Sequence, residues 1–338
     1  MTLAKNVVLL PYNTFGIQAK AAAFTAVGST EDIKNLVSSG DLKTEHLILG
    51  GGSNILITKD FKGLVVKVEI KGKEVIEETD DYIVLRVGAG ENWHEFVMYC
   101  VANNYGGVEN LSLIPGTVGA APMQNIGAYG VEIKKNIVKV EAIEKSTGHV
   151  RFFNNEECHF GYRESIFKHE AKDKFIITHV TFRLTKRDHE LNITYGAIDE
   201  TIRQLGVQSL TIKAVSDAVI HIRSTKLPDP KQIGNAGSFF KNPSIQPDLL
   251  DFIKRDYPNI PSFPSTEGLV KIPAAWLIEQ CGWKGKTFDN IGVHRNQALV
   301  LVNYGGGSGE KIWELAMNIK ESVKEKFNID LQPEVNVI

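Results

Sequence analysis

The densest group of residues that could do chemistry lies in the ten-residue stretch 234–243. Ser238 stands there between a glycine-flanked turn and two phenylalanines, and Lys241 and Asn242 follow closely. Small residues let a backbone approach a ligand, and a hydroxyl walled off from water can deliver a proton to a reacting carbon. A loop that covers a buried phenylalanine pair would have the same residues. The stretch alone therefore leaves a proton-donor site and a packed loop as equal alternatives.

Two glycine-rich loops could hold a nucleotide cofactor. The first comprises residues 50–54, directly after the apolar segment 47–49, and its successive backbone N–H groups could converge on a phosphate. It matches neither the G-x-G-x-x-G fingerprint nor a P-loop, which argues against a Rossmann nicotinamide site. The second, 113–130, is long, irregular and rich in Gly, Ala and Pro, and such segments are more often functional than not. Either loop alone could be a plain turn, but the two together favour a bound nucleotide.

Charged and phenolic residues elsewhere could bind an anionic substrate. Arg163 lies among aromatic residues and could hold a carboxylate through two donors, or form a surface ion pair of little consequence. Tyr195 adds a phenol that could bind the same ligand. A pair of cations, Arg223 and Lys226, precedes a proline-fixed turn and suits a diphosphate, although a solvated helix end is a close alternative. Glu334 could donate a proton if a dry environment raised its pKa, or it could be an exposed tail residue.

Composition and charge exclude several classes of function. The chain has 338 residues, 43% of them hydrophobic and 23% charged, as in a soluble globular protein of two or three domains. A net charge of -2 provides no basic face for nucleic acid. Three distant cysteines, with Cys158 expected to be a packed thiol, and nine unclustered histidines predict no disulfide and no metal site. No apolar run suits a signal peptide or membrane helix, so we expect a cytosolic protein.

The elements that must position these residues begin as an α/β unit and continue as a strand-rich region. The predicted strands are 21–27, 47–49, 63–68, 82–87, 137–144, 150–153, 175–184 and 298–303. The predicted helices are one opening at Thr30 as its cap, then 93–102, 211–224, 247–255, 274–281 and 310–327. We expect Ser308 to cap the last helix after a flexible glycine run, and the extended segment 328–338 to return to an earlier domain.

Taken together, these segments resemble the UDP-N-acetylenolpyruvoylglucosamine reductase family of bacterial cell-wall precursor synthesis. The segments that carry the resemblance are 13–16, 50–54, 114–130, 161–168, 225–230, 234–243 and 333–335, which span nearly the whole chain. The resemblance implies an α+β fold with two FAD-binding subdomains of the vanillyl-alcohol oxidase type and a C-terminal substrate domain. The implied boundaries are 1–70 and 71–225 for the two subdomains, 226–327 for the substrate domain and 328–338 for an arm that returns to the FAD site.

The resemblance also implies a reaction and the residues that serve it. NADPH reduces FAD, and flavin N5 then gives hydride to C3 of UDP-N-acetylglucosamine enolpyruvate, which yields UDP-N-acetylmuramate. By similarity, Ser238 protonates C2, while Arg163 and a protonated Glu334 stabilise the enolate-like charge. The implied substrate-binding residues are Tyr195, Lys226, Asn242 and Gln297. The implied cofactor-binding residues are Gly50, Gly51, Gly52, Ser53, Asn54, Pro115, Gly116, Thr117, Gly119, Ala120, Asn125, Gly127, Ala128 and Tyr129.

Two positions depart from the family pattern. Phe263 stands in a predicted substrate-covering loop where a tyrosine is often expected, and a phenylalanine can stack but cannot donate a hydrogen bond. Asn336 stands where some relatives have a basic residue, so the substrate carboxylate would depend more on Arg163. We expect a monomer that takes a small nucleotide sugar and neither nucleic acid nor membrane.

Proteins of two other classes would share part of this pattern. An alcohol-oxidising flavoprotein of the same FAD fold would have the glycine loops but should lack both the stretch 234–243 and Glu334. A non-catalytic nucleotide-sugar binder would bind no flavin, and its purified form would be colourless.

Overall fold

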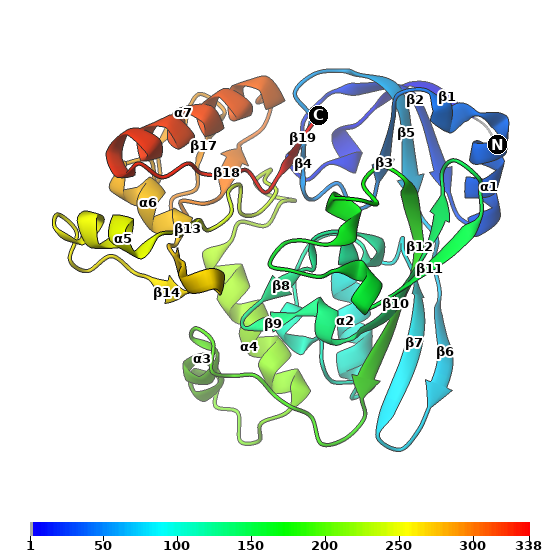
Figure 1. The fold of residues 1–338 in the computed structure, drawn as a ribbon, viewed down its shortest axis with the longest axis horizontal. Helices are drawn as coiled ribbons and strands as arrows, with labels where there is room; N and C mark the ends of the chain where they lie inside the picture. The colour runs from blue at the N-terminus through cyan, green and yellow to red at the C-terminus, as the bar shows by residue number, and fades with distance from the viewer. Residues whose placement is uncertain (1–2) are drawn as a thin grey trace. The chain divides into compact units, whose positions relative to one another are not determined.

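The computed structural model describes residues 3–338, which divide into two compact units, each assembled from separate stretches of chain. The first unit contains the chain up to Val7, Ala21–Gly51 and Lys62–Thr225, and the second contains Val8–Lys20, Gly52–Phe61 and Lys226–Ile338. Figure 1 labels the helices and strands of both. The four functional segments implied by the family resemblance stay a prediction.

The first unit opens with a four-stranded sheet in the order β1-β2-β5-β3. Its strands are β1 (Ala4–Val8), β2 (Lys20–Val27), β5 (Phe61–Val68) and β3 (His46–Leu49). Helix α1 (Thr30–Ser39) buries Ile33 and Leu36 in the same core as these strands. The helix is capped by Ser29, whose hydroxyl accepts from the Asp32 N–H while the Asp32 carboxylate accepts from the Ser29 N–H. The prediction of Thr30 as the cap was therefore wrong by one residue, because this capping box fixes the start of the helix.

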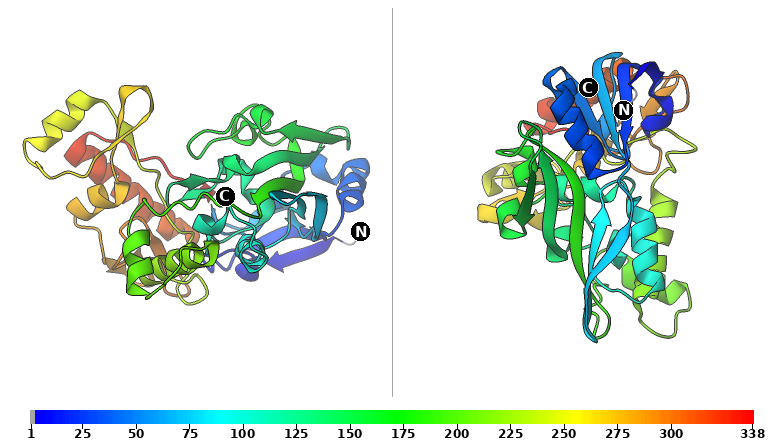
Figure 2. Two further views of the ribbon diagram at one scale, coloured as in Figure 1. Left: turned by 90° about the horizontal axis from the view of Figure 1, so that it is seen from below. Right: turned by 90° about the vertical axis from the view of Figure 1, so that its right-hand side faces the viewer.

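The second sheet of this unit is antiparallel, with strands in the order β11-β10-β12-β7-β6. Its strands are β11 (Val150–Asn154), β10 (Ile137–Glu144), β12 (Phe175–Thr185), β7 (Tyr82–Gly88) and β6 (Lys73–Glu78). Helix α2 (Trp93–Ala102) runs along one face (Figure 2). There the rings of Trp93 and Phe96 pack against the ring of Phe182. The predicted strands are confirmed. The edge strand β6 was not predicted, because all six of its residues are exposed and no apolar alternation marks it.

Between these elements the predicted irregular segment 113–130 is confirmed. It contains only two short 3-10 turns, Val118–Ala120 and Pro122–Gln124, and the two-residue strand β8 (Gly127–Ala128), which pairs with β9 (Val131–Glu132). Helices α3 (Ile198–Gln204) and α4 (Ile212–Lys226) then form a small separate core, against which Tyr129 packs.

The second unit brings the C-terminal segment back to an early part of the chain. Strand β19 (Asn336–Val337) pairs in parallel with β4 (Ile55–Leu56) (Figure 1). The other strands of the unit are β13 (Ser244–Ile245), β14 (Phe263–Pro264), β15 (Val270–Lys271), β16 (Thr287–Phe288), β17 (Ile291–Val293) and β18 (Leu301–Asn303). Its helices are α5 (Pro247–Lys254), α6 (Ala274–Gln280) and α7 (Gly309–Phe327).

The connection into α7 is held by hydrogen bonds to the side chains of Ser308 and Asn303. Ser308 caps the helix by accepting from the Lys311 N–H, as predicted. The Asn303 side-chain oxygen accepts from the N–H groups of Gly305 and Gly307, so these donors are satisfied within the protein. Strand β18 is shorter than the predicted 298–303, since only its last three residues make ladder bonds.

Neither a cluster of metal-ligating side chains nor a membrane-spanning helix is found in residues 3–338. Among them, no group of three or more His, Cys, Asp or Glu side chains is placed to hold a metal ion. Across the same residues, no helix combines the length and apolar character that crossing a membrane would need. The thiol of Cys158 is buried, as predicted, and burial raises its pKa to about 12.

Candidate active site

The two glycine loops touch each other within the first unit. A side-chain carbon on Gly51 would lie 2.7 Å from the Cα of Gly116, and one on Gly50 would lie 2.7 Å from the Thr117 hydroxyl. At position 51 backbone therefore packs directly on backbone, and at position 50 it packs on the Thr117 side chain, so a larger residue at either position would force its neighbour to move. Close backbone approach of this kind is what glycine permits at a turn that contacts a ligand.

Other predicted cofactor residues have structural partners of their own. Gly119 packs on the turn after β7, where a side-chain carbon would lie 2.5 Å from the Ala89 methyl group. Asn125 is buried, donates to Gly161 and Glu132 at 2.9 and 3.0 Å, and accepts from the Lys134 N–H at 3.0 Å. These bonds fix the shape of the second loop beside the turn that carries Arg163. Pro115 and Ala120 are exposed on the same loop.

The end of the second loop carries a cluster of phenols and guanidinium groups. Tyr129 has a left-handed backbone with φ 51°, and its side chain lies close enough to Arg223 of α4 for the two groups to interact electrostatically. Burial lowers the pKa of the Arg223 guanidinium, the nearby Arg163 lowers it further, and Tyr129 opposes both. A guanidinium nevertheless keeps its charge in proteins at neutral pH. Two cations in one partly buried place favour an anionic ligand, because like charges repel each other there.

Tyr195 lies beside this cluster, within the same unit. Its Cβ would be 3.2 Å from a side-chain carbon on Gly130, and its ring is 59% exposed. Arg223 points inward to Tyr129, whereas Lys226, at the end of α4, is exposed. The two cations that the sequence placed together therefore have different surroundings.

The second unit holds the stretch 234–243 between two other segments. Phe239 donates its N–H to Leu299 and accepts from the Glu334 N–H, both at 2.8 Å. Phe239 and Phe240 are fully buried, while Ser238 is exposed. The packed-loop interpretation of this stretch is therefore confirmed for the two phenylalanines. The proton-donor interpretation stays a prediction, with the exposed Ser238 on a segment adjacent to Glu334.

The first glycine loop continues into this second unit, which contains Gly52, Ser53 and Asn54. The Asn54 side chain donates to the Glu334 carbonyl at 3.1 Å. The backbone and side chain of Asn336 both donate to the Asn54 carbonyl, at 3.0 and 3.1 Å. Asn336, noted from the sequence only as a departure from the family pattern, thus helps to anchor the C-terminal segment.

Comparisons with known proteins agree along the whole chain. Residues 229–338 match the family model for the C-terminal domain of UDP-N-acetylenolpyruvoylglucosamine reductase, and residues 21–154 match that for an FAD binding domain. The chain is 50% identical to the UDP-N-acetylenolpyruvoylglucosamine reductase of Flavobacterium johnsoniae and 51% identical to that of Amoebophilus asiaticus, each over 100% of both chains. The chain belongs to the UDP-N-acetylenolpyruvoylglucosamine reductase family.

A solved structure supports the same fold. The UDP-N-acetylenolpyruvylglucosamine reductase of Thermus caldophilus matches with a TM-score of 0.70 at 22% identity, covering 100% of this chain and 99% of that one. The predicted α+β fold with an FAD-binding region and a C-terminal domain is confirmed. As a member of the reductase family, the chain is an oxidoreductase with FAD as its cofactor.

The second unit also contains Asn242 and Gln297, which are predicted to bind substrate, and Phe263 of the predicted substrate-covering loop. The oxygens of the Asn242 and Gln297 side chains already accept hydrogen bonds within the protein. The Asn242 oxygen accepts from the Ala274 N–H at the start of α6, at 2.9 Å, which leaves its amide hydrogens as donors. The Gln297 oxygen accepts from the Leu299 N–H at 3.4 Å. Phe263 is 56% exposed on β14, so its ring is available for stacking. Their roles stay predictions.

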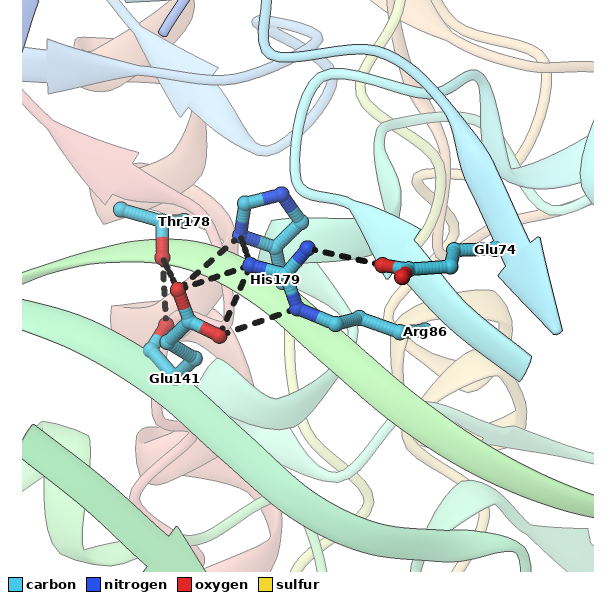
Figure 3. A network of polar contacts seen from close by, with 5 residues as sticks. All are labelled: Glu74, Arg86, Glu141, Thr178 and His179. Carbon is cyan, nitrogen blue, oxygen red and sulfur yellow. Dashed lines mark hydrogen bonds and ion pairs between the residues drawn. The ribbon is translucent and has the colours of Figure 1, made fainter. Parts of the chain in front are cut away.

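A second charged cluster of the reductase lies on the five-stranded sheet, and the sequence did not single it out (Figure 3). Arg86 lies between Glu141 and Glu74, and its Nη2 is 2.9 Å from the Glu141 Oε2. Hydrogen bonds from His179 and Arg86 hold the pKa of the buried Glu141 down, to about 2. Thr178 adds a further bond to the Glu141 carbonyl. The groups satisfy one another, so this cluster stabilises the sheet.

Proposed function

We propose that this chain reduces UDP-N-acetylenolpyruvoylglucosamine to UDP-N-acetylmuramate, with NADPH as the electron source. Its full-length identity to named reductases supports the reaction. The observation that carries the site assignment is the cluster of Arg163, Arg223 and Tyr129 at the end of the second glycine loop. An enolpyruvyl ether of a nucleotide sugar is an anion with a carboxylate next to its double bond, and this cluster suits such a group.

The glycine loops would hold FAD. In the first unit, Gly50, Gly51, Gly116 and Thr117 present backbone close to backbone, which suits the pyrophosphate. When bound and reduced by NADPH, FAD would supply the hydride for the enolpyruvyl double bond. Tyr129, held in a left-handed conformation and packed on the small core of α3 and α4, would fix the end of the loop beside the cofactor.

Arg163 would stabilise the charge that develops on the substrate. Hydride addition at C3 pushes negative charge onto C2 and its carboxylate, and a fixed guanidinium lowers the energy of that state. Removing one such donor from an enzyme typically lowers the rate about 10²–10³-fold. Glu334, in its protonated form, would act on the same carboxylate.

Ser238 would deliver the proton to C2. Its hydroxyl is exposed while the next two side chains are buried, so its backbone is fixed but its oxygen is accessible. A serine hydroxyl is a weak acid, so Lys226, the amide of Asn242 or water would have to assist it. The exposed Tyr195 and Lys226, together with Gln297, would position the diphosphate and sugar. We expect the enzyme to act as a monomer in the cytoplasm.

The test separates the two half-reactions under anaerobic conditions. In Ser238→Ala, NADPH should reduce the flavin at the wild-type rate, while reoxidation by the enolpyruvyl substrate should slow by orders of magnitude. Ser38→Ala removes an exposed hydroxyl of α1 that bonds only the Lys34 carbonyl, and it serves as the matched control. Equal losses in both half-reactions of Ser238→Ala would refute the proton-donor role. A wild-type flavin that NADPH reduces and the substrate never reoxidises would refute the proposed substrate.

A further inference from the structure

The second glycine loop begins at a residue with an unfavourable backbone conformation. Leu113 has φ 58°, in the left-handed region that large side chains rarely adopt. Such a residue costs about 1–3 kcal/mol and persists only where its surroundings hold it in place. Leu113 directly precedes the segment that contacts Gly50 and Gly51, so its conformation sets the direction in which the loop leaves.

Two helices of the first unit hold the polar groups of Leu113. Its N–H donates to the Nδ1 atom of His94 on α2, at 3.1 Å. Its carbonyl accepts from the Nε atom of Arg223 on α4, at 3.2 Å. His94, Leu113 and Arg223 are therefore linked by two hydrogen bonds through the backbone of Leu113. Arg223 in turn interacts electrostatically with Tyr129.

The residues before Leu113 are fixed by the same two helices. The Trp93 indole of α2 donates to the Leu111 carbonyl at 2.9 Å. The hydroxyls of Ser112 and of Ser216 on α4 are 2.8 Å apart, and both residues are fully buried. The segment is thus hydrogen-bonded to α2 on one side and to α4 on the other. The bond to His94 is the one that holds the N–H of Leu113, the residue with the left-handed backbone.

We propose that His94 is a positioning residue of the active site, whose neutral Nδ1 holds the Leu113 peptide so that its carbonyl aims Arg223 at Tyr129 and the substrate anion. This inference rests on the proposed function. His94 must be neutral and carry its proton on Nε2, because Nδ1 accepts a hydrogen bond. Burial lowers the His94 pKa, and the charge of Arg223 lowers it further while Glu95 on the same helix opposes, in agreement with a neutral ring.

The first experiment compares two substitutions at this position in the FAD-loaded protein. His94→Leu removes the acceptor, and His94→Asn keeps an oxygen near the place of Nδ1. In His94→Leu we expect kcat/KM for the enolpyruvyl substrate to fall about 10–100-fold, since small misplacements of a binding group have effects of that size. The fall should appear mainly in KM, and His94→Asn should recover most of it. The control is His221→Asn, because His221 is exposed on the same helix as Arg223.

A second measurement does not depend on activity. Nitrogen NMR of wild-type protein with labelled histidine should show His94, assigned by its loss in His94→Asn, as a neutral ring protonated on Nε2. A ring protonated on Nδ1 would overturn the inference even if His94→Leu failed to fold. His94→Leu with wild-type kcat and KM would overturn it too, and equal losses in His94→Asn and His94→Leu would do so as well. If the wild-type protein does not turn over the substrate, the proposed function fails instead, whatever the NMR shows.

Discussion

Gly51→Ala should weaken FAD binding while the protein remains folded. The added methyl carbon would lie 2.7 Å from the Cα of Gly116, whereas ordinary van der Waals contacts of this kind begin at 3.4 Å. The neighbouring atom belongs to backbone and cannot rotate away. The two glycine loops would therefore have to part by about 0.7 Å at this point, and they would have to close again to bind the cofactor.

The magnitude follows from the cost of forcing one extra carbon into a packed place. Such overpacking typically costs about 1–3 kcal/mol. If the loops relax apart in the apoprotein and must close around FAD, this energy opposes binding, and at about 1.4 kcal/mol per tenfold the dissociation constant rises roughly 5- to 150-fold. Gly50→Ala should behave similarly, although its nearest neighbour is the Thr117 hydroxyl rather than backbone.

The assay is a titration of apoprotein with FAD, followed by quenching of the flavin fluorescence, together with thermal unfolding of the apoprotein. Gly28→Ala is the matched control, because its methyl carbon would meet only the Asp32 carboxylate, at 3.9 Å, in the same unit. Wild-type FAD affinity in a destabilised Gly51→Ala apoprotein would refute the reasoning. The glycine would then serve packing alone, and the contact between the loops would not form part of the cofactor site.

Three further predictions concern charged groups. Glu141→Gln leaves Arg86 without its main partner, and since the Glu141 pKa lies at about 2 instead of 4.5 we expect a loss of about 3 kcal/mol in unfolding free energy at pH 7. This contribution is complete above pH 4.5 and is lost as the pH falls towards 2, so equal urea stability of variant and wild type at pH 7 would contradict the prediction. Burial lowers the pKa of His94 and His294, so the unfolded chain takes up these protons at a higher pH than the folded protein does, and the free energy of unfolding should decline as the pH falls below about 6.5. Urea unfolding at pH 7.5 and 5.5 checks this, and a pH dependence in His94→Asn equal to that of the wild type would argue against it. Glu334→Gln keeps a hydrogen-bond donor and should retain partial turnover with normal flavin reduction by NADPH, whereas full turnover would mean that the glutamate is only structural.

Much of the fold could be predicted because strong periodicity marks buried elements. The strand predicted at 175–184 is β12 (Phe175–Thr185), and the helix predicted at 310–327 is α7 (Gly309–Phe327). Strand β6 was missed because it lies at a sheet edge and faces solvent with charged residues. Strand β6 forms by pairing with β7, and the local sequence of β6 gives no sign of that pairing.

The candidate site was predictable by residue type but not by arrangement. Glycines at 50, 51 and 116 indicate tight backbone, yet their mutual contact depends on tertiary packing. The same holds for His94 and Leu113, since a histidine on a helix and a leucine before Ile-Pro-Gly carry no local sign of their hydrogen bond. A hint was available in the proline and glycine that follow Leu113, which favour a turn there.

The most direct test of the proposed function is the anaerobic visible spectrum of the purified protein. We predict a flavin band that bleaches when NADPH is added and returns when UDP-N-acetylenolpyruvoylglucosamine follows. A band that bleaches but does not return with this substrate would contradict the proposed reaction while leaving the fold intact. A protein that shows no flavin band even after FAD is supplied would contradict the assignment of the cofactor itself.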